Sequence, residues 1–249
     1  MLPPIFYANP DLIADNQVVL DKEESHHAVS VMRLKPPEIV IIINGQGTAY
    51  RGEIINIDSR KQVTVKFHST IRNFGETSSK VCLAIGMSAN YKLDTVIQKG
   101  TELGVKRFVP LLTEKSKIKI DNSKKKYSKV RRLEKVALSA IKQCRRSYIP
   151  EISEPVKFIE YLNQTEKTDL NLIFHTEKKS SKFNLDSIDK NSKRISLLIG
   201  PESGFSNEEY EMALEAGFQS VSLGSRILRT ETAGIFIPGL IMYLLNELS

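Results

Sequence analysis

Two glycine-containing turns near the C-terminus constrain the fold of this chain most. They lie in the stretches Leu197–Phe205 and Leu223–Ala233, and each follows a short apolar run typical of a buried parallel strand. A helical pattern follows each turn. Open α/β sheets bind ligands where strands end in such turns, and glycine lets the backbone approach a ligand closely. We therefore expect a ligand site at these two turns.

The second part of the chain alternates strand and helix patterns, which predicts a parallel α/β sheet. The expected strands are Val81–Met87, Arg107–Leu112, Leu172–His175, Ile195–Ile199 and Ser220–Leu223. The expected helices are Lys92–Leu103, Lys124–Ser147, Asn207–Ala216 and Thr232–Leu248. Pro238 is expected to kink the last helix or to mark its true start.

The first part of the chain predicts a small β-barrel, because short strands follow one another with tight turns. One helix interrupts them, starting at Glu24-Ser25, and the polar stretch Asn73–Ser79 predicts a domain boundary. We expect a barrel domain over residues 1–72, a linker over 73–79 and an α/β domain over 80–249. The expected strands of the barrel are Gln17–Leu20, Ile39–Asn44, Thr48–Ile57 and Gln62–Thr70.

The positive charge is unevenly distributed along the chain. The formal net charge is +7, yet residues 1–75 hold 8 Lys/Arg and 8 Asp/Glu, whereas residues 106–146 hold 15 Lys/Arg and 3 Asp/Glu. Such a segment favours binding to nucleic acid, although a solvated basic surface gives the same pattern.

The long basic helix carries its charges opposite an apolar stripe that we expect to pack on the sheet. Like charges on one helix face repel unless an anion offsets them, which favours RNA as the partner. The stripe is Leu133, Val136, Ala137, Ala140, Ile141 and Cys144, and the opposite face carries Arg131, Lys135, Lys142 and Arg146.

Cysteine and hydropathy patterns exclude several classes of protein. The two cysteines, Cys82 and Cys144, have no metal-ligand spacing and suit a reducing cytosol. The N-terminus lacks a signal-peptide pattern, and the longest apolar stretch, Ala233–Leu245, is too short to span a bilayer. Neither G-x-G-x-x-G nor a P-loop pattern is present. We expect a cytoplasmic protein with no metal and no membrane partner.

Three further motifs precede the two turns. They are Ser25–Leu34, Lys92–Val105 and the spaced residues Ala140, Gln143, Arg146 and Pro150. In this order, the five motifs resemble the RsmE family, the 16S ribosomal RNA uridine-N3 methyltransferases of the SPOUT superfamily. The resemblance covers most of the chain.

The chain departs from the family's pattern at three places. The family usually has Gly where this chain has Ser203, and a Cβ there would make a positive φ costly. It commonly has Gly-Asp where this chain has Pro36-Pro37-Glu38. An arginine often found among the first few residues is absent from Pro3–Phe6, and with it any RNA contact that it makes.

The resemblance implies an α/β fold with a PUA-like N-terminal β-barrel and a SPOUT methyltransferase domain whose C-terminal part forms a trefoil knot. It also implies a homodimer that methylates N3 of a uridine in 16S ribosomal RNA, or in the small ribosomal subunit, with S-adenosylmethionine. Two alternatives stay open. One is a SPOUT enzyme acting on another RNA or atom, such as a ribose 2′-oxygen, and the other is a non-catalytic RNA-binding assembly factor.

The turns and the resemblance together suggest residues for each role. Candidates to remove the N3 proton or stabilise the uridine oxyanion are Glu202, Arg229 and Glu231. Candidates for RNA contacts are His26, Arg33, Lys92, Lys99 and Arg146. Candidates for cofactor binding are His175, Ile199, Gly200, Pro201, Glu202, Gly204, Leu223, Gly224, Ile227, Leu228, Thr232 and Ala233.

Structural roles are alternatives for three of these residues. His175 could be a packed histidine at a strand end. Glu231 could favour the helix dipole in the first turn of the last helix. Arg229 could pair with Glu202 or Glu231.

Overall fold

The computed structural model describes residues 2–88, 90–116, 122–164, 168–175, 184 and 188–248. The chain forms two compact units. The first combines Met1–Glu76 with Leu138–Ile149, and the second combines Thr77–Ala137 with Pro150–Ser249. A short segment from the middle of the sequence therefore belongs to the N-terminal unit.

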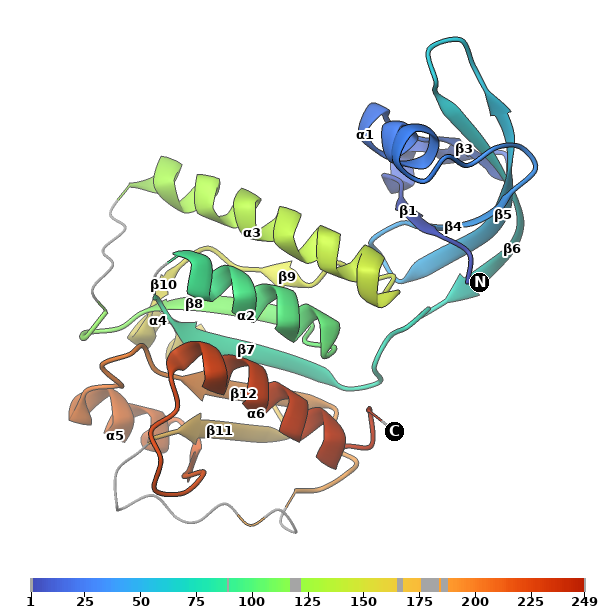
Figure 1. Ribbon diagram of the computed structural model, residues 1–249. Coiled ribbons are helices and arrows are strands. Elements are labelled where there is room, and N and C mark those ends of the chain that lie inside the picture. The colour runs from blue at the N-terminus through green and yellow to red at the C-terminus, as the bar shows by residue number, and fades with distance from the viewer. Residues whose placement is uncertain are drawn as a thin grey trace. The chain divides into compact units, whose positions relative to one another are not determined.

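The first unit contains a curled, mostly antiparallel sheet of six strands (Figure 1). The order is β1-β4-β5-β6-β3-β2, and only β1 and β4 are parallel. Since β1 and β2 form the two edges, the sheet is an open half-barrel. The strands are β1 (Ile5–Tyr7), β2 (Ile13–Ala14), β3 (Gln17–Val19), β4 (Ile39–Ile43), β5 (Thr48–Ile57) and β6 (Val63–Arg72).

One short helix packs against this sheet. Helix α1 (Lys22–His26) starts at Lys22 rather than at Glu24, because the Asp21 side chain caps it by accepting a hydrogen bond from Glu24 N at 2.8 Å. A π-helical turn, His27–Val31, continues the helix and buries Ala28 in the core.

Strand β4 is apolar throughout because both of its faces are covered. Val40 and Ile42 lie in the core that includes Ala28. Ile41 and Ile43 pack with Ile141, which lies near the end of helix α3 (Ser123–Cys144). Burial of Ile141 explains why the end of α3 belongs to the first unit.

The second unit contains a parallel sheet in the order β10-β8-β7-β12-β11-β13, with β9 also paired to β8. The predicted parallel α/β sheet is therefore confirmed. The two-residue strands β9 and β10 were not predicted. The strands are β7 (Lys80–Gly86), β8 (Arg107–Leu112), β9 (Glu151–Ile152), β10 (Val156–Lys157), β11 (Leu170–Phe174), β12 (Arg194–Ile199) and β13 (Gln219–Val221).

Helices cover both faces of this sheet. Along β7, Leu83 and Ile85 face one core whereas Ala84 faces the other, so the strand is apolar at successive positions. Helices α2 (Asn90–Glu102), α3 and α6 (Thr230–Leu244) contribute to the first core, and α4 (Phe158–Gln164) and α5 (Asn207–Glu215) contribute to the second (Figure 1).

Of the helices that the structure describes, α6 is the most apolar. Pro238 lies inside it, so this proline does not mark its start. Across the described residues, neither α6 nor any other helix has the length and apolarity needed to cross a membrane.

Glu247 ties the C-terminal end of the second unit to the start of β7. Its carboxylate accepts hydrogen bonds of 2.7–3.0 Å from the backbone N–H and the hydroxyl of both Ser78 and Ser79. Burial raises the pKa of Glu247, but the four hydrogen bonds outweigh burial and bring the pKa below its ordinary value of 4.5. The ionised form therefore stabilises the fold.

We expect Glu247→Gln to lower the free energy of unfolding at neutral pH by about 1–2 kcal/mol, because it removes charge-assisted hydrogen bonds at a partly exposed site. Since the folded-state pKa is lowered, the wild-type protein has this stability above the unfolded-state pKa and loses it as pH falls through the folded-state pKa. Urea denaturation from about pH 7 to about pH 3 should therefore show the difference shrinking.

Glu211→Gln provides the control, because Glu211 is an exposed carboxylate on α5. It should change the free energy of unfolding little at any pH. A Glu247→Gln effect that stays the same across the pH series would contradict the assignment.

Candidate functional site

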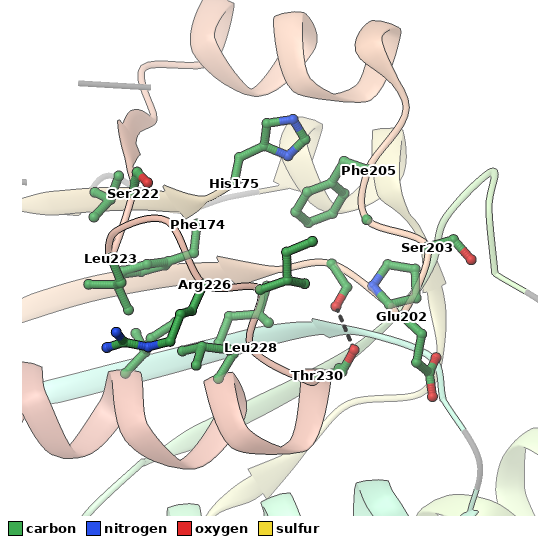
Figure 2. Close-up of a pocket in the computed structure, with 18 of the residues that line it drawn as sticks. Phe174, His175, Glu202, Ser203, Phe205, Ser222, Leu223, Arg226, Leu228 and Thr230 are labelled. Carbon is green, nitrogen blue, oxygen red and sulfur yellow. Dashed lines mark hydrogen bonds between the residues drawn. The ribbon is translucent and has the colours of Figure 1, made fainter. Parts of the chain in front are cut away.

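A cavity of about 350 Å³ lies at the carboxyl ends of β11, β12 and β13 (Figure 2). Its volume falls within the range of small-molecule sites, and its place is where parallel sheets bind ligands. The two glycine-containing turns supply most of its lining.

Nearly all residues predicted to bind a cofactor line this cavity. Thr232 does not line it and is exposed on α6. Of the three catalytic candidates, Glu202 lines the cavity, whereas Arg229 and Glu231 lie beside it, at the start of α6. The predicted lining residues found there are His175, Ile199, Gly200, Pro201, Glu202, Gly204, Leu223, Gly224, Ile227, Leu228 and Ala233.

The turn after β12 lies directly against the end of β7. A Cβ on Gly86 would lie 2.3 Å from the backbone nitrogen of Pro201, so only glycine fits there. Within the turn, the N–H of Gly204 donates to the carbonyl of Pro201 at 2.9 Å, and Gly204 has φ of +69°. Close packing and this hydrogen bond fix the shape of the turn.

Ser203 stands where the family usually has Gly, and a positive φ would be costly there. Ser203 does not have a positive φ. Gly204 is the residue with positive φ in this turn. The Ser203 side chain is exposed and points away from the other labelled side chains (Figure 2). The extra Cβ therefore adds no backbone strain.

Hydrogen bonds hold the far side of the first turn. Ser206 and Glu209 form a capping box at the start of α5, with bonds of 2.9 and 3.2 Å. The other carboxylate oxygen of Glu209 accepts the N–H of Glu114 at 2.8 Å, and Lys115 Nζ donates to the carbonyl of Phe205 at 2.9 Å. The segment after β8 thereby brings Lys115 to the cavity.

The second turn joins the first through Thr230. Its hydroxyl donates to the carbonyl of Gly200 at 3.3 Å (Figure 2, dashed line). Gly224 has φ of +105°, which favours glycine, and Ile227 is 81% exposed although it lines the cavity. The second turn therefore offers an exposed apolar side chain to a ligand.

His175 has both a packing role and a place in the cavity wall. Its backbone N–H donates to the carbonyl of Val221 at 3.1 Å, and its ring stacks on Tyr210 with centroids 4.7 Å apart. Several lining residues were not predicted, although most of them are neighbours of predicted ones. They include Lys115, Phe174, Ser203, Phe205, Ser222, Arg226, Thr230 and Ile237.

Lys92 pairs with acidic residues of both turns. Its Nζ lies 2.8 Å from Glu202 Oε1 and 3.5 Å from Glu231 Oε2. The hydrogen bond to Glu202 raises the pKa of Lys92, and burial only partly opposes it. Lys92 thus pairs with one carboxylate from each turn.

Comparison with known proteins identifies the family. Residues 75–242 match the RNA methyltransferase domain family, and residues 20–67 match the RNA methyltransferase PUA domain family. The chain is 33% identical over 237 residues to ribosomal RNA small subunit methyltransferase E of Buchnera aphidicola subsp. Acyrthosiphon pisum, with 93% of this chain and 90% of the relative covered. This chain belongs to the ribosomal RNA small subunit methyltransferase E (RsmE) family. The family predicted from the motifs is confirmed.

Two solved structures share the RsmE fold over nearly the whole chain. Lpg2936 from Legionella pneumophila, solved with bound S-adenosylmethionine, is 30% identical with a TM-score of 0.85. The RsmE protein of Neisseria gonorrhoeae, also bound to S-adenosylmethionine, is 26% identical with a TM-score of 0.86. Each comparison covers 98% of both chains.

The residues of this RsmE protein predicted to contact RNA have different surroundings. Arg146 is 2% exposed and pairs with Glu76 at 3.0 Å, so it cannot reach RNA without leaving that partner. Lys99 pairs with Glu102 at 2.8 Å on the same helix. His26 and Arg33 are exposed in the first unit and are accessible to a partner.

We expect Gly86→Ala to lower the free energy of unfolding of this RsmE protein by about 1–3 kcal/mol, because the new Cβ must displace Pro201. Urea denaturation measures the change. Gly239→Ala on α6 is the control, since its Cβ would meet Leu103 at an ordinary 3.5 Å and should be neutral or slightly stabilising. Equal destabilisation by both substitutions would refute the role of Gly86.

Proposed function

We propose that this protein transfers a methyl group from S-adenosylmethionine to N3 of a uridine in 16S ribosomal RNA. The observation that carries the proposal is the cavity, because the two RsmE-like turns form most of its lining. Two relatives that are 26–30% identical over 98% of this chain were solved with S-adenosylmethionine bound. The family's name supports small-subunit RNA as the substrate, and the motifs' resemblance supports uridine N3.

The cavity lining fits S-adenosylmethionine on its own chemistry. Ile199, Leu223 and Leu228 offer apolar surface, and Gly200 and Gly224 leave backbone uncovered. Backbone N–H and C=O groups can form hydrogen bonds to an adenine edge without charged side chains. When bound, S-adenosylmethionine supplies an electrophilic methyl group.

The side chains around the cavity can prepare the uridine for reaction. Attack from N3 requires that its proton be removed or weakened. Glu202 lines the cavity and is the carboxylate best placed to accept this proton. Arg229 is exposed at the start of α6, where its guanidinium can stabilise a uridine oxyanion. Glu231 pairs with Lys92 and helps to hold that lysine next to Glu202.

We place the main RNA surface of the second unit on the first half of α3. Lys142 and Arg146, near the end of the helix, pair with Glu24 and Glu76, so protein carboxylates already offset their charge. The first half keeps an exposed basic face with one exposed aromatic ring, on which Arg131 also pairs with Glu134 of the same helix at 3.4 Å but stays 61% exposed. Phosphate contacts there can offset the cost of flipping a uridine out of its stack, about a few kcal/mol. The face consists of Lys124, Lys125, Tyr127, Arg131 and Lys135.

The domain organisation and the knot implied by the resemblance are part of the proposal. Residues 1–72 would form the PUA-like RNA-binding domain, residues 73–79 the linker, and residues 80–249 the SPOUT domain with its trefoil knot. The two family matches support a boundary between residues 67 and 75, although the segment Leu138–Ile149 packs with the first compact unit. A crystal structure of the protein would test the knot, because the traced chain shows directly whether its C-terminal part is threaded through a loop.

A homodimer is proposed from the outer face of α6. Phe236 and Tyr243 on this helix are 50% and 68% exposed, and exposed apolar side chains on one face favour a protein partner. Sedimentation equilibrium should show a dimer that Tyr243→Glu weakens, and a monomeric wild-type protein would oppose the proposal. A chain with only two cysteines, Cys82 and Cys144, and no metal-ligand spacing between them suits a reducing cytoplasmic location, where ribosomal RNA is also found.

A non-catalytic RNA-binding factor is the alternative from another class. A strained Ser203 in the first turn would favour such a factor, because it would weaken cofactor binding. Ser203 does not have a positive φ, which supports the enzyme instead. A SPOUT enzyme with another target atom remains the nearer alternative, and the identity of the methylated nucleoside separates the two.

We expect the purified protein to bind S-adenosylmethionine with a Kd of roughly micromolar order in calorimetric titration. It should convert a uridine of 16S RNA or of small ribosomal subunits into 3-methyluridine, identified by mass spectrometry of digested nucleosides. If a different methylated nucleoside is found, the enzyme methylates another atom than uridine N3. Tight RNA binding without cofactor binding would favour the assembly factor.

Arg229→Ala should lower kcat by about a hundredfold, since it removes a charge that stabilises the reacting oxyanion. The Kd for S-adenosylmethionine should stay within about threefold, because Arg229 does not line the cavity. Steady-state kinetics and calorimetry measure the two quantities. An equal loss of both would mean that Arg229 only shapes the pocket.

Arg131→Glu combined with Lys135→Glu should weaken binding to 16S RNA at least about tenfold at low salt and flatten the dependence on salt. Fluorescence titration at several salt concentrations measures both effects. Lys80→Glu combined with Lys190→Glu is the matched control. It changes the net charge equally. Lys80 lies at the amino end of β7, whereas the cavity lies at the carboxyl ends of the strands. Equal losses in both double variants would oppose a specific RNA face.

A further inference from the structure

Lys92 lies where three segments of the second unit meet. It is in the first turn of α2, and its ammonium group contacts Glu202 from the turn after β12 and Glu231 from the first turn of α6. The side chain is only 17% exposed, which is low for a lysine. The groups that act on its charge are Glu202, Glu231 and the neighbouring Tyr91.

Glu231 depends on Lys92 for charge compensation. Its Oε2 atom is shielded from solvent and accepts no hydrogen bond from any residue that the structure describes. The ammonium group of Lys92, 3.5 Å away, is the cation that faces this oxygen. A buried carboxylate oxygen without a cation is costly, so removal of Lys92 would push Glu231 to move or to become solvated.

Glu202 connects the same ammonium group to the cavity. Its carboxylate accepts a hydrogen bond of 2.8 Å from Lys92, and its residue lines the cavity. The two turns are also joined by the hydrogen bond from Thr230 to Gly200. Lys92 thus adds a second, electrostatic connection between the turns, and this one includes the start of α2.

We propose that Lys92 is a positioning residue of the cofactor pocket, which holds Glu202 and Glu231 so that the two turns keep their binding geometry before RNA arrives. This inference rests on the proposed function. It differs from the RNA contact that the sequence analysis predicts for Lys92. The ammonium group already has two carboxylate partners, so a phosphate would have to displace them.

The two roles of Lys92 predict different results in the absence of RNA. A residue that only contacts RNA leaves S-adenosylmethionine binding unchanged when it is replaced. A positioning residue changes the affinity for S-adenosylmethionine even though it does not line the cavity. Calorimetric titration of the full chain with S-adenosylmethionine alone therefore separates them.

We expect Lys92→Met to raise the Kd for S-adenosylmethionine about tenfold, the size associated with loss of one charged hydrogen bond. Lys92→Arg keeps the charge and should stay within about threefold of the wild-type Kd. Arg107→Met is the matched control. It breaks an ion pair of 3.2 Å with Glu151 at the start of β8, away from the cavity, and should leave the Kd unchanged.

Glu202→Gln tests the same contact from the other side and remains available if Lys92→Met fails to fold, which circular dichroism would show. If the two groups act together, the Kd of the double variant Lys92→Met/Glu202→Gln for S-adenosylmethionine should be no higher than the higher Kd of the two single variants. Additive losses would overturn the inference, as would an unchanged Kd in Lys92→Met. A wild-type protein that binds no S-adenosylmethionine would instead overturn the proposed function and this inference with it.

Discussion

The pocket depends on a backbone contact that only glycine permits. The end of β7 lies against the turn after β12, and a Cβ on Gly86 would reach within 2.3 Å of Pro201 N. The position of that turn determines where Gly200 can accept the hydrogen bond from Thr230, and hence where α6 begins. A missing side chain at the end of β7 thus determines the geometry of both turns that line the cavity.

Charge compensation within the protein decides which basic residues face solvent. Two cations near the end of α3, Lys142 and Arg146, pair with acids of the first unit. Lys92 pairs with two acids at the pocket. The excess positive charge that remains exposed is therefore concentrated on the first half of α3, and the sequence total of +7 alone does not locate it. In this protein, exposed charge, rather than total charge, indicates where an anionic partner can bind.

Local signals made much of the fold predictable. Apolar runs bounded by turn residues predicted β7, β8 and β12 nearly to their ends, and the two glycine-containing turns predicted most of the cavity lining. The short strands β9 and β10 were missed because two residues carry too little pattern, and their strand conformation comes from pairing with β8. A small β-barrel was predicted, and the strands curl into an open half-barrel whose two edges are β1 and β2.

Long-range partners were the part of the site that the sequence could not reveal. Arg146 is 70 residues from Glu76, its ion-pair partner, and Lys92 is 110 residues from Glu202. A lysine in a motif has the same pattern whether it faces a phosphate or a carboxylate, because only the folded chain brings the acids near it. For the same reason, no spacing in the sequence could predict that Lys115 lies in the cavity wall.

The first unit is built from two segments that are far apart in the sequence, and this has a consequence for synthesis of the protein. Ile41 and Ile43 emerge early from the ribosome, but Ile141, which packs against them, follows about a hundred residues later. The N-terminal unit therefore cannot complete its core until the segment Leu138–Ile149 has left the exit tunnel. Until then, one face of its sheet presents bare isoleucines to the surrounding cell, and translation speed over the intervening residues sets how long that exposure lasts.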